Sequence, residues 1–298
     1  MIRPLYMLAF DHRASFLSKL MGIPGTPTPE EIARVSDAKK VIFEGFQQAV
    51  AAGTPRESAG ILVDEQFGAD IARTSRAEGF VLAMPVEKSG QDEFDFEYGD
   101  EFGAHIEAFD PSFAKVLVRY NPEGDADMNR RQAARLRVLS DWLHERGRKF
   151  LFELLVAAEP HQLERVSGDV GRFDREVRHG LMVTAIEQLQ DSGVEPDVWK
   201  IEGLERREEC ELVARTARRD GRESVSCVVL GRGEDEEAVV RWLRQGAGVP
   251  GYIGFAIGRT IWWDAMNGYL SGDASREGAS KTISDNYRRM IDVYTSAS

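Results

Sequence analysis

Apolar runs of strand length alternate with amphipathic segments along the whole chain, and turn residues separate them. The runs are rich in β-branched and aromatic residues, whereas the segments between them repeat apolar residues every three or four positions. The predicted strands are residues 5–10, 61–63, 80–84, 115–120, 150–156, 197–203, 225–230 and 252–257. The predicted helices are residues 28–53, 69–78, 128–146, 174–191, 205–220, 235–245 and 281–294.

Strand and helix units in alternation predict a closed parallel (β/α)8 TIM barrel, a fold of the α/β class. A doubly wound open sheet is the alternative, but the turn after the first strand lacks the GxGxxG fingerprint of that fold. No linker or break in composition divides the chain, so residues 1–298 are expected to form one barrel domain. In such barrels the carboxyl ends of the strands and the loops that follow them carry the chemistry.

The sixth predicted strand, Asp197–Gly203 (DVWKIEG), holds a lysine in an otherwise apolar run. Burial disfavours the charged form of lysine and lowers its pKa, which makes the amine a better nucleophile. The alternative is a lysine at a strand end whose amine extends to water. Side chains alternate along a strand, so Lys200 pointing into the barrel places Glu202 on the same side and Trp199 toward the helices.

Three more charged residues are placed to meet Lys200 inside the barrel. Glu153 lies in the fifth strand, Lys115 begins the fourth, and Asp11 follows the first. Barrel layers are built from alternate strands, so the two lysines are expected to share or adjoin a layer with the carboxylates beside them. A buried amine next to a second cation can attack a ketone to give an iminium, and a carboxylate can transfer the protons. The alternative is a salt-bridge network that only fills the barrel.

Glycine and arginine follow the last two strands, as Gly231 and Arg232 in LGRG and as Gly258 and Arg259 in IGRT. The loops at these positions frequently bind phosphate in this fold, because glycine amides approach the anion closely and arginine donates two parallel hydrogen bonds. The alternative is turn glycine beside a solvated arginine. Together the two dipeptides predict a phosphate site at the mouth of the barrel.

The balance of charge limits the partners of the protein. The chain has 50 acidic and 38 basic residues and a net charge of -12, which argues against nucleic acid or an anionic membrane. No apolar run is long enough for a signal peptide or a bilayer span, and two cysteines are too few for a disulfide framework, so a cytoplasmic protein is expected. The sequence is compatible with a homo-oligomer and does not define the number of subunits.

Motifs from one end of the chain to the other resemble the aldolase-like barrel domain (DUF2090 type) that is found fused to 5-dehydro-2-deoxygluconokinase in inositol catabolism. The matching stretches are LAFDHRASF, LVDEQFGA, MPVEKSGQDEFDFEYG, KVLVRYNPEGD, RKFLFELLV, EPDVWKIEG, VVLGRGED and GFAIGRTIWW. More distantly, AFDHR, KVLVRY and WKIE are similar to motifs of class I tagatose-bisphosphate aldolases. LGRG differs from the serine-containing seventh strand of those enzymes.

The resemblance implies a class I aldolase in which Lys200 forms the Schiff base and Glu153 is the acid and base. Lys115 and Asp11 are implied as assisting polar groups. Lys88, Gly258 and Arg259 are implied as residues around the substrate and its phosphate. Arg13, Gly231 and Arg232 are further candidates for this binding site, from their places after the first and seventh strands. The implied substrate is a phosphorylated ketose, 2-deoxy-5-keto-gluconate 6-phosphate, which is cleaved to dihydroxyacetone phosphate and malonate semialdehyde. Another phosphorylated or sulfonated ketose remains an alternative.

Two other functions remain open at this point. A metal-dependent aldolase or isomerase needs ligands, but the five histidines show no ligand spacing, so no metal or other cofactor is expected. A barrel that binds a sugar phosphate without catalysis is the third reading. The polar and aromatic segment of residues 87–103 is a candidate for a lid or specificity element, and a packed surface loop is its alternative.

Overall fold

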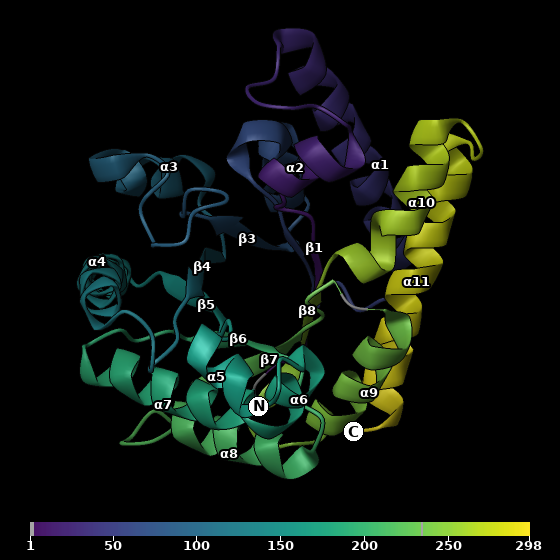
Figure 1. Ribbon diagram of the computed structural model, residues 1–298. Coiled ribbons are helices and arrows are strands. Elements are labelled where there is room, and N and C mark those ends of the chain that lie inside the picture. Colours follow the sequence, from purple (N-terminus) through teal and green to yellow (C-terminus); the bar gives the residue numbers. More distant parts are fainter. Residues whose placement is uncertain (1–2, 234) are drawn as a thin grey trace.

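The apolar runs form a closed parallel barrel in which each strand pairs with its neighbours in chain order, β1 through β8, and β8 pairs with β1 (Figure 1). The structure, a computed structural model, describes residues 3–233 and 235–298. Met1, Ile2 and Glu234, the last of which falls in the predicted LGRGED loop, lie outside the described residues. The strands are β1 (Leu5–Ala9), β2 (Ala59–Leu62), β3 (Val81–Pro85), β4 (Phe113–Arg119), β5 (Lys149–Leu155), β6 (Val198–Glu202), β7 (Ser226–Leu230) and β8 (Tyr252–Ile257). The predicted (β/α)8 fold is confirmed.

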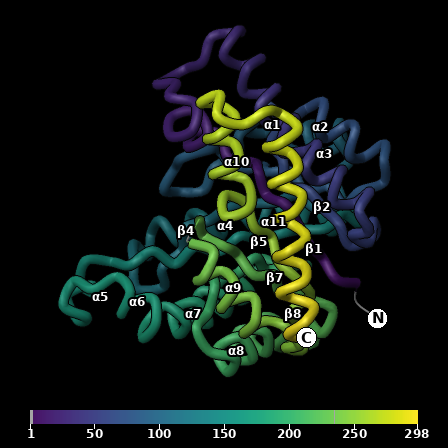
Figure 2. Tube along the Cα trace, turned by 90° about the vertical axis from the view of Figure 1, so that its right-hand side faces the viewer, coloured from purple at the N-terminus to yellow at the C-terminus, as the bar shows by residue number. Residues whose placement is uncertain are grey.

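Helices surround the barrel and cover the outer face of its strands (Figure 1). They are α1 (Pro29–Ala51), α2 (Glu65–Ala77), α3 (Phe102–Phe109), α4 (Ala126–Glu145), α5 (Pro160–Arg165), α6 (Val170–Glu176), α7 (Arg178–Asp191), α8 (Arg207–Ala217), α9 (Glu236–Gly246), α10 (Arg259–Ser271) and α11 (Arg276–Ser296). The last helix, α11, packs lengthwise against α1 and so joins the two ends of the chain (Figure 2). Among the described residues, no helix combines the length and the apolar character needed to cross a membrane.

The sequence pattern did not predict four helical features. No helix was expected for α3, α5 or α10, and a single helix was expected over residues 174–191, where the structure has α6 and α7. Val177, with φ -119 and ψ -46, breaks the axis between them. The aromatic residues at the start of α10 are not typical helix formers, but Ile261 and Trp262 become buried, and tertiary packing overrides propensity.

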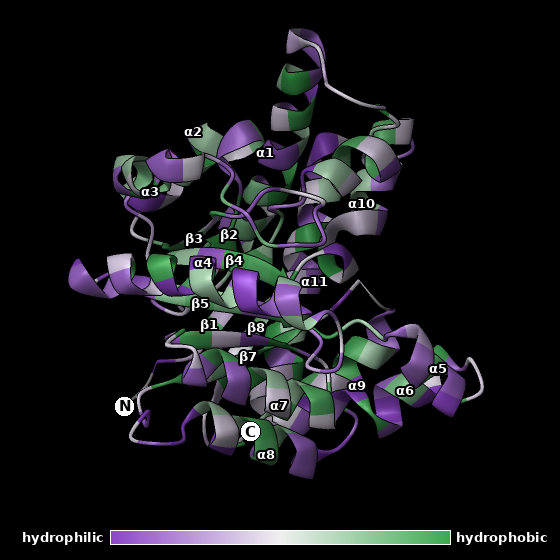
Figure 3. Ribbon diagram, turned by 60° about the vertical axis from the view of Figure 1, so that its left-hand side comes forward, coloured by the Kyte–Doolittle hydropathy of each residue, from purple (hydrophilic) through white to green (hydrophobic). Residues whose placement is uncertain are grey.

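Two apolar layers hold the barrel together. The outer layer lies between strands and helices and contains Phe152, Trp199 and Ile201, as the alternation of side chains predicts. The inner layer fills the lower barrel and contains Val198. Colouring by hydropathy shows hydrophobic stretches on the strands and helices of mixed character around them (Figure 3). The inner layer closes the floor beneath the charged residues that follow along the same strands.

A buried ion pair fixes the loop that follows β1. Lys39 of α1 donates to the carbonyl oxygens of Phe10 (2.9 Å) and His12 (3.0 Å) and pairs with Asp64, and both charged side chains are fully buried. The other carboxylate oxygen of Asp64 accepts from the backbone N–H of Phe67 at 2.8 Å and caps α2. One lysine therefore ties two βα loops and two helices together just outside the barrel mouth.

We expect Lys39→Met to lower the free energy of unfolding by roughly 3–5 kcal/mol, because removal of one partner leaves the other charge buried and unpaired. Lys40 is exposed on the same helix, so Lys40→Met is the matched control and is expected to change stability by less than about 0.5 kcal/mol. Urea unfolding of both variants measures the difference. Equal effects of the two substitutions would show that the pair does not hold the loop.

Candidate active site

The carboxyl ends of the strands surround a cavity of about 320 Å³. Strands β4, β5 and β6 contribute side chains to its wall, and the loops after β1, β3, β7 and β8 close its sides. The titratable residues that line it are Asp11, His12, Arg13, Glu87, Lys88, Lys115, Arg119, Glu153, Lys200, Arg232 and Arg259. The cavity is therefore small, lined by many titratable side chains and placed where this fold carries its chemistry.

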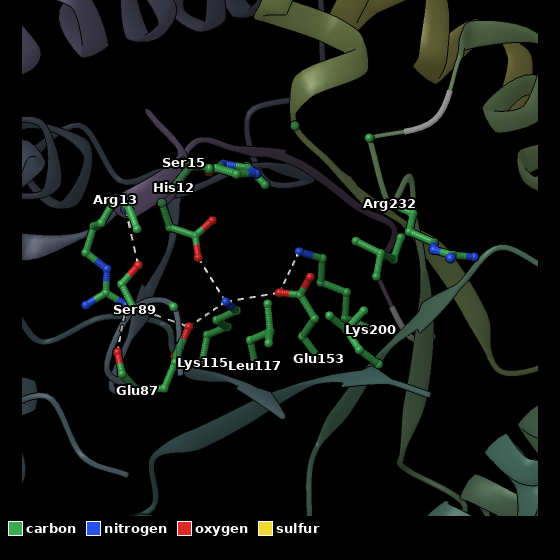
Figure 4. A pocket seen from close by; sticks show the side chains of 18 of the residues that line it. His12, Arg13, Ser15, Glu87, Ser89, Lys115, Leu117, Glu153, Lys200 and Arg232 are labelled. Atoms are coloured by element: carbon green, nitrogen blue, oxygen red, sulfur yellow. Dashed lines mark hydrogen bonds and ion pairs between the residues drawn. The ribbon is translucent and has the colours of Figure 1, made fainter. Parts of the chain in front are cut away.

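One carboxylate oxygen lies between two amines at the bottom of this cavity. Oε2 of Glu153 is 2.9 Å from Nζ of Lys200 and 3.0 Å from Nζ of Lys115 (Figure 4). Lys200 and Lys115 are only 3% and 1% exposed. Glu153 pairs in register with Lys200 on β6 and with Leu117 on β4. Lys115 thus starts one layer lower, and its long side chain extends up to the level of Lys200.

Lys115 is surrounded by carboxylates from three other elements. Besides Glu153, its amine lies 2.9 Å from Oδ2 of Asp11 and 2.8 Å from Oε1 of Glu87. Burial opposes the charge, but the three carboxylates outweigh burial and hold the pKa of Lys115 well above its usual value. Lys115 is therefore a fixed cation, and Lys200 is the amine with a single carboxylate contact among the described residues.

The carboxylates respond differently to the same surroundings. Burial favours the neutral acid in each, but nearby cations, Lys115 first, outweigh it and hold the pKa of Asp11 and of Glu153 below the usual range. For Glu87 burial prevails over Lys115 and Arg13, and its pKa is raised. Its Oε2 is buried without a hydrogen-bond partner among the described residues. The lowered pKa of Glu153 thus favours its ionised form, whereas the raised pKa of Glu87 favours the protonated acid.

Glu202 shares the inward parity of Lys200 but does not line the cavity. Its Oε1 is 3.0 Å from Nη1 of Arg178 and 3.2 Å from Nε of Arg232, and its Oε2 accepts from the N–H of Val156 at 2.8 Å. Burial raises its pKa despite these cations. Glu202 therefore fixes the ends of β5, β6 and β7.

Three of the predicted substrate-binding cations have carboxylate partners. Arg13 is 2.8 Å from Glu97. It also donates to the backbone oxygen of Glu87 at 2.7 Å (Figure 4), so it holds the loop of residues 87–103. Lys88 lies 2.7 Å from Asp95. The guanidinium of Arg232 points away from Lys200 and lies 2.7 Å from Asp174. All three line the cavity, and their roles in substrate binding stay predictions.

The glycine–arginine pairs after β7 and β8 differ in position. Gly231 packs near Ile257 and Val239 and does not line the cavity, whereas Gly258 and Arg259 do. A Cβ at Gly258 would lie 2.3 Å from the backbone oxygen of Ala9, so only glycine fits there. Gly258 precedes the first turn of α10, whose N–H groups and positive dipole end favour an anion. The structure thus leaves the pair after β8 as the better phosphate candidate.

Glu87, His12 and Arg119 line the cavity and were not among the sequence candidates. His12 lies edge-on to Trp262, and burial together with Arg259 and Lys200, against the opposing effect of Asp11, lowers its pKa to about 4. It is therefore a neutral imidazole near pH 7. Glu87 comes from a loop, to which the alternation of side chains along a strand does not apply. Arg119 lies on the same face of its strand as Lys115, and this alternation is the signal that could have identified it.

In the described residues, no group of three or more potential metal ligands is found.

Solved structures share the fold at low sequence identity. Cgl0159 from Corynebacterium glutamicum matches with a TM-score of 0.59 and 16% identity over 97% of this chain and 85% of that one. A Schiff base-forming fructose-1,6-bisphosphate aldolase matches with a TM-score of 0.55 and 12% identity, over 98% and 94%. An archaeal fructose 1,6-bisphosphate aldolase matches with a TM-score of 0.58 and 13% identity, over 98% and 93%. These likenesses concern the barrel itself.

No curated protein matches the sequence. The family described as an uncharacterized protein conserved in bacteria, DUF2090, matches residues 1–298, the full length of the chain. That match covers the strands, the cavity and the lysine–carboxylate cluster at its bottom, which consists of Lys115, Lys200, Asp11, Glu87 and Glu153. The chain therefore belongs to the DUF2090 family.

Proposed function

We propose that the protein is a class I aldolase that cleaves a phosphorylated ketose through a Schiff base on Lys200. The observation that carries the proposal is the single Glu153 oxygen between the amines of Lys200 and Lys115 at the bottom of the cavity. A nucleophile, a base within hydrogen-bond reach and a second group that orients the base are the parts that covalent catalysis needs. The fold shared with solved aldolases adds support.

Glu153 and Lys115 have separate tasks in formation of the Schiff base. Glu153 takes a proton from the ammonium of Lys200, and the free amine attacks the ketone carbon. A proton then moves from the attacking nitrogen to the former ketone oxygen, which gives the neutral carbinolamine. Lys115, which stays charged, donates a hydrogen bond to the developing oxygen. Glu153 then returns its proton to the carbinolamine hydroxyl, which leaves as water, and the nitrogen becomes a protonated iminium.

In the cleavage step, Glu153 accepts a proton instead of donating one. The ionised Glu153 removes the proton of the hydroxyl on the β-carbon, the bond between the α- and β-carbons breaks, and its electron pair moves into the iminium to give an enamine. The β-carbon leaves as an aldehyde. Protonation of the enamine at the α-carbon and hydrolysis of the iminium release the ketone and restore Lys200. Asp11 contacts Lys115 and keeps it in place for each step.

The phosphate of the ketose is assigned to the mouth of the barrel at β8. Gly258, the N-terminus of α10 and the Arg259 side chain provide close amides and a guanidinium there. The substrate that we propose is 2-deoxy-5-keto-gluconate 6-phosphate, in which the ketone stands next to the phosphate-bearing carbon. Its cleavage gives dihydroxyacetone phosphate and malonate semialdehyde.

Borohydride inactivation tests the class of mechanism. Borohydride together with dihydroxyacetone phosphate is expected to abolish activity, because it reduces the iminium to a stable amine, while either reagent alone is expected to leave most activity. A chelator is expected to have no effect. Activity that a chelator abolishes, without inactivation by the reagent pair, would identify a metal-dependent lyase; binding of the ketone with no turnover would identify a non-catalytic barrel.

Lys200→Met is expected to fold normally and to lose turnover by at least about 10³-fold, since it removes the nucleophile and keeps the length of the side chain. Lys149→Met, at the exposed start of β5, is the matched control and should retain activity. Circular dichroism and coupled detection of dihydroxyacetone phosphate measure fold and turnover. Turnover retained in Lys200→Met contradicts the mechanism.

The pH profile tests the electrostatic role of Lys115. Glu153 must be ionised to accept protons, so its depressed pKa places the acid limb of kcat/KM below the usual range of a glutamate. Lys115→Met removes the cation that most lowers this pKa and leaves burial unopposed except by Lys200. The acid limb is therefore expected to move to higher pH, and Lys149→Met should leave it in place. An unmoved limb in Lys115→Met would show that Lys115 does not set the charge of Glu153.

A further inference from the structure

Two arginines on opposite sides of the cavity differ from its other cations. Arg119 ends β4 and Arg259 begins α10 directly after β8, and these strands are diametrically opposed in the eight-stranded barrel. Arg119 donates to the backbone oxygen of Gln91 at 2.7 Å, and Arg259 donates to the backbone oxygen of Arg232 at 2.8 Å. Neither forms an ion pair with a carboxylate in the part of the chain that the structure describes.

The other cations of the cavity wall are neutralised by the protein itself. Their carboxylate partners lie at 2.7 to 3.0 Å. The pairs are Arg13–Glu97, Lys88–Asp95, Lys115 with Asp11, Glu87 and Glu153, Lys200–Glu153, and Arg232–Asp174. A chain of net charge -12 supplies carboxylates readily, so the two arginines without one stand out. Each is partly buried at the wall of a small cavity, where an anion from the substrate would compensate the charge.

The position of Arg119 relative to the cluster defines which part of the substrate it meets. Arg119 pairs in register with Leu155, two residues beyond Glu153 on β5, so it stands about 7 Å nearer the mouth than the acid and base. Leu117 and Leu155 line the wall between them. With the phosphate at β8 and the ketone at Lys200, the fragment beyond the cleaved bond extends across this apolar wall toward β4.

The backbone around Arg119 is held independently of its side chain. Nε2 of Gln132 donates to the backbone oxygen of Arg119 at 3.1 Å, and Oε1 of Gln132 accepts from the N–H of Phe94 at 2.8 Å. Arg131 and Arg135 both bind Glu93 in the same loop at 2.7 Å. The loop of residues 87–103 thus has anchors on α4 besides the single Arg119–Gln91 hydrogen bond, and the remaining N–H groups of the guanidinium are available for a ligand.

We propose that Arg119 is the specificity residue for the aldehyde half of the substrate and binds an anionic group at its end. The inference rests on the proposed aldolase function and adds to it the residue that selects aldehydes with a terminal carboxylate or phosphate. A guanidinium matches either anion with two parallel hydrogen bonds. The enzyme then holds its substrate by an anion at each end, with Lys200 and Glu153 at the bond between them.

The condensation reaction measures this preference. Dihydroxyacetone phosphate is combined with malonate semialdehyde, with glyceraldehyde 3-phosphate, and with neutral propionaldehyde. We expect the wild type to favour at least one anionic aldehyde over propionaldehyde in kcat/KM, and the favoured one identifies the anion as carboxylate or phosphate. Arg119→Gln is expected to lower kcat/KM for the favoured aldehyde by about 10–100-fold, the size of a lost charge-assisted hydrogen bond, and to leave propionaldehyde nearly unchanged.

A purely structural role for Arg119 gives a different pattern. If its only task is to anchor Gln91, Arg119→Gln lowers kcat/KM for all three aldehydes by the same factor, and the proposal is overturned; a wild type without preference overturns it as well. Arg131→Gln removes another anchor of the loop, outside the cavity, and is expected to preserve the preference. Borohydride inactivation with dihydroxyacetone phosphate needs no aldehyde, so it must persist in Arg119→Gln. Its absence in the wild type would instead reject the proposed function and this assignment with it.

Discussion

The structure depends on one buried carboxylate shared by two amines. Isolated charges are costly inside a protein, and a group such as Glu153 is stable there only when cations and hydrogen bonds compensate it. Lys115 provides that compensation permanently, because Asp11 and Glu87 hold it as a cation. Lys200 therefore shares its carboxylate with a group that does not change its charge. This asymmetry makes one lysine part of the framework and leaves the other for chemistry.

The cluster is assembled from parts of the chain far apart in sequence. Strands β4, β5 and β6 supply the two amines and Glu153, while the loops after β1 and β3 supply Asp11 and Glu87. Arg13 joins those loops by binding Glu97 and the backbone of Glu87, and Lys39 fixes the backbone on either side of Asp11. The charged groups are thus held from above and from the side, over an apolar floor inside the barrel. Such pre-organisation is what transfers of protons between fixed groups require.

The sequence predicted the parts of the site that follow from strand periodicity. Lys200, Glu153 and Lys115 were placed inward by alternation, and Asp11 by its position after β1; the structure brings all four together. The position of Glu87 in the cavity and the ion pairs of Arg13 and Arg232 with carboxylates could not be predicted. These contacts are made by loops, and they depend on tertiary packing rather than on a repeat in the sequence. For the same reason α10 was missed: burial of Trp262, rather than helix propensity, determines that this segment is helical. Alternation places Arg119 on the same face as Lys115. Only the structure shows that, among the described residues, no carboxylate pairs with it.

The central claim is that Lys200, and not the neighbouring Lys115, is the nucleophile. Peptide mass mapping after borohydride reduction in the presence of dihydroxyacetone phosphate tests it most directly, because the reduced adduct marks the attacking amine. We expect the added mass on the peptide that contains Lys200 and an unmodified peptide around Lys115. An adduct on Lys115, or no adduct on either lysine in an enzyme that turns over, would contradict it.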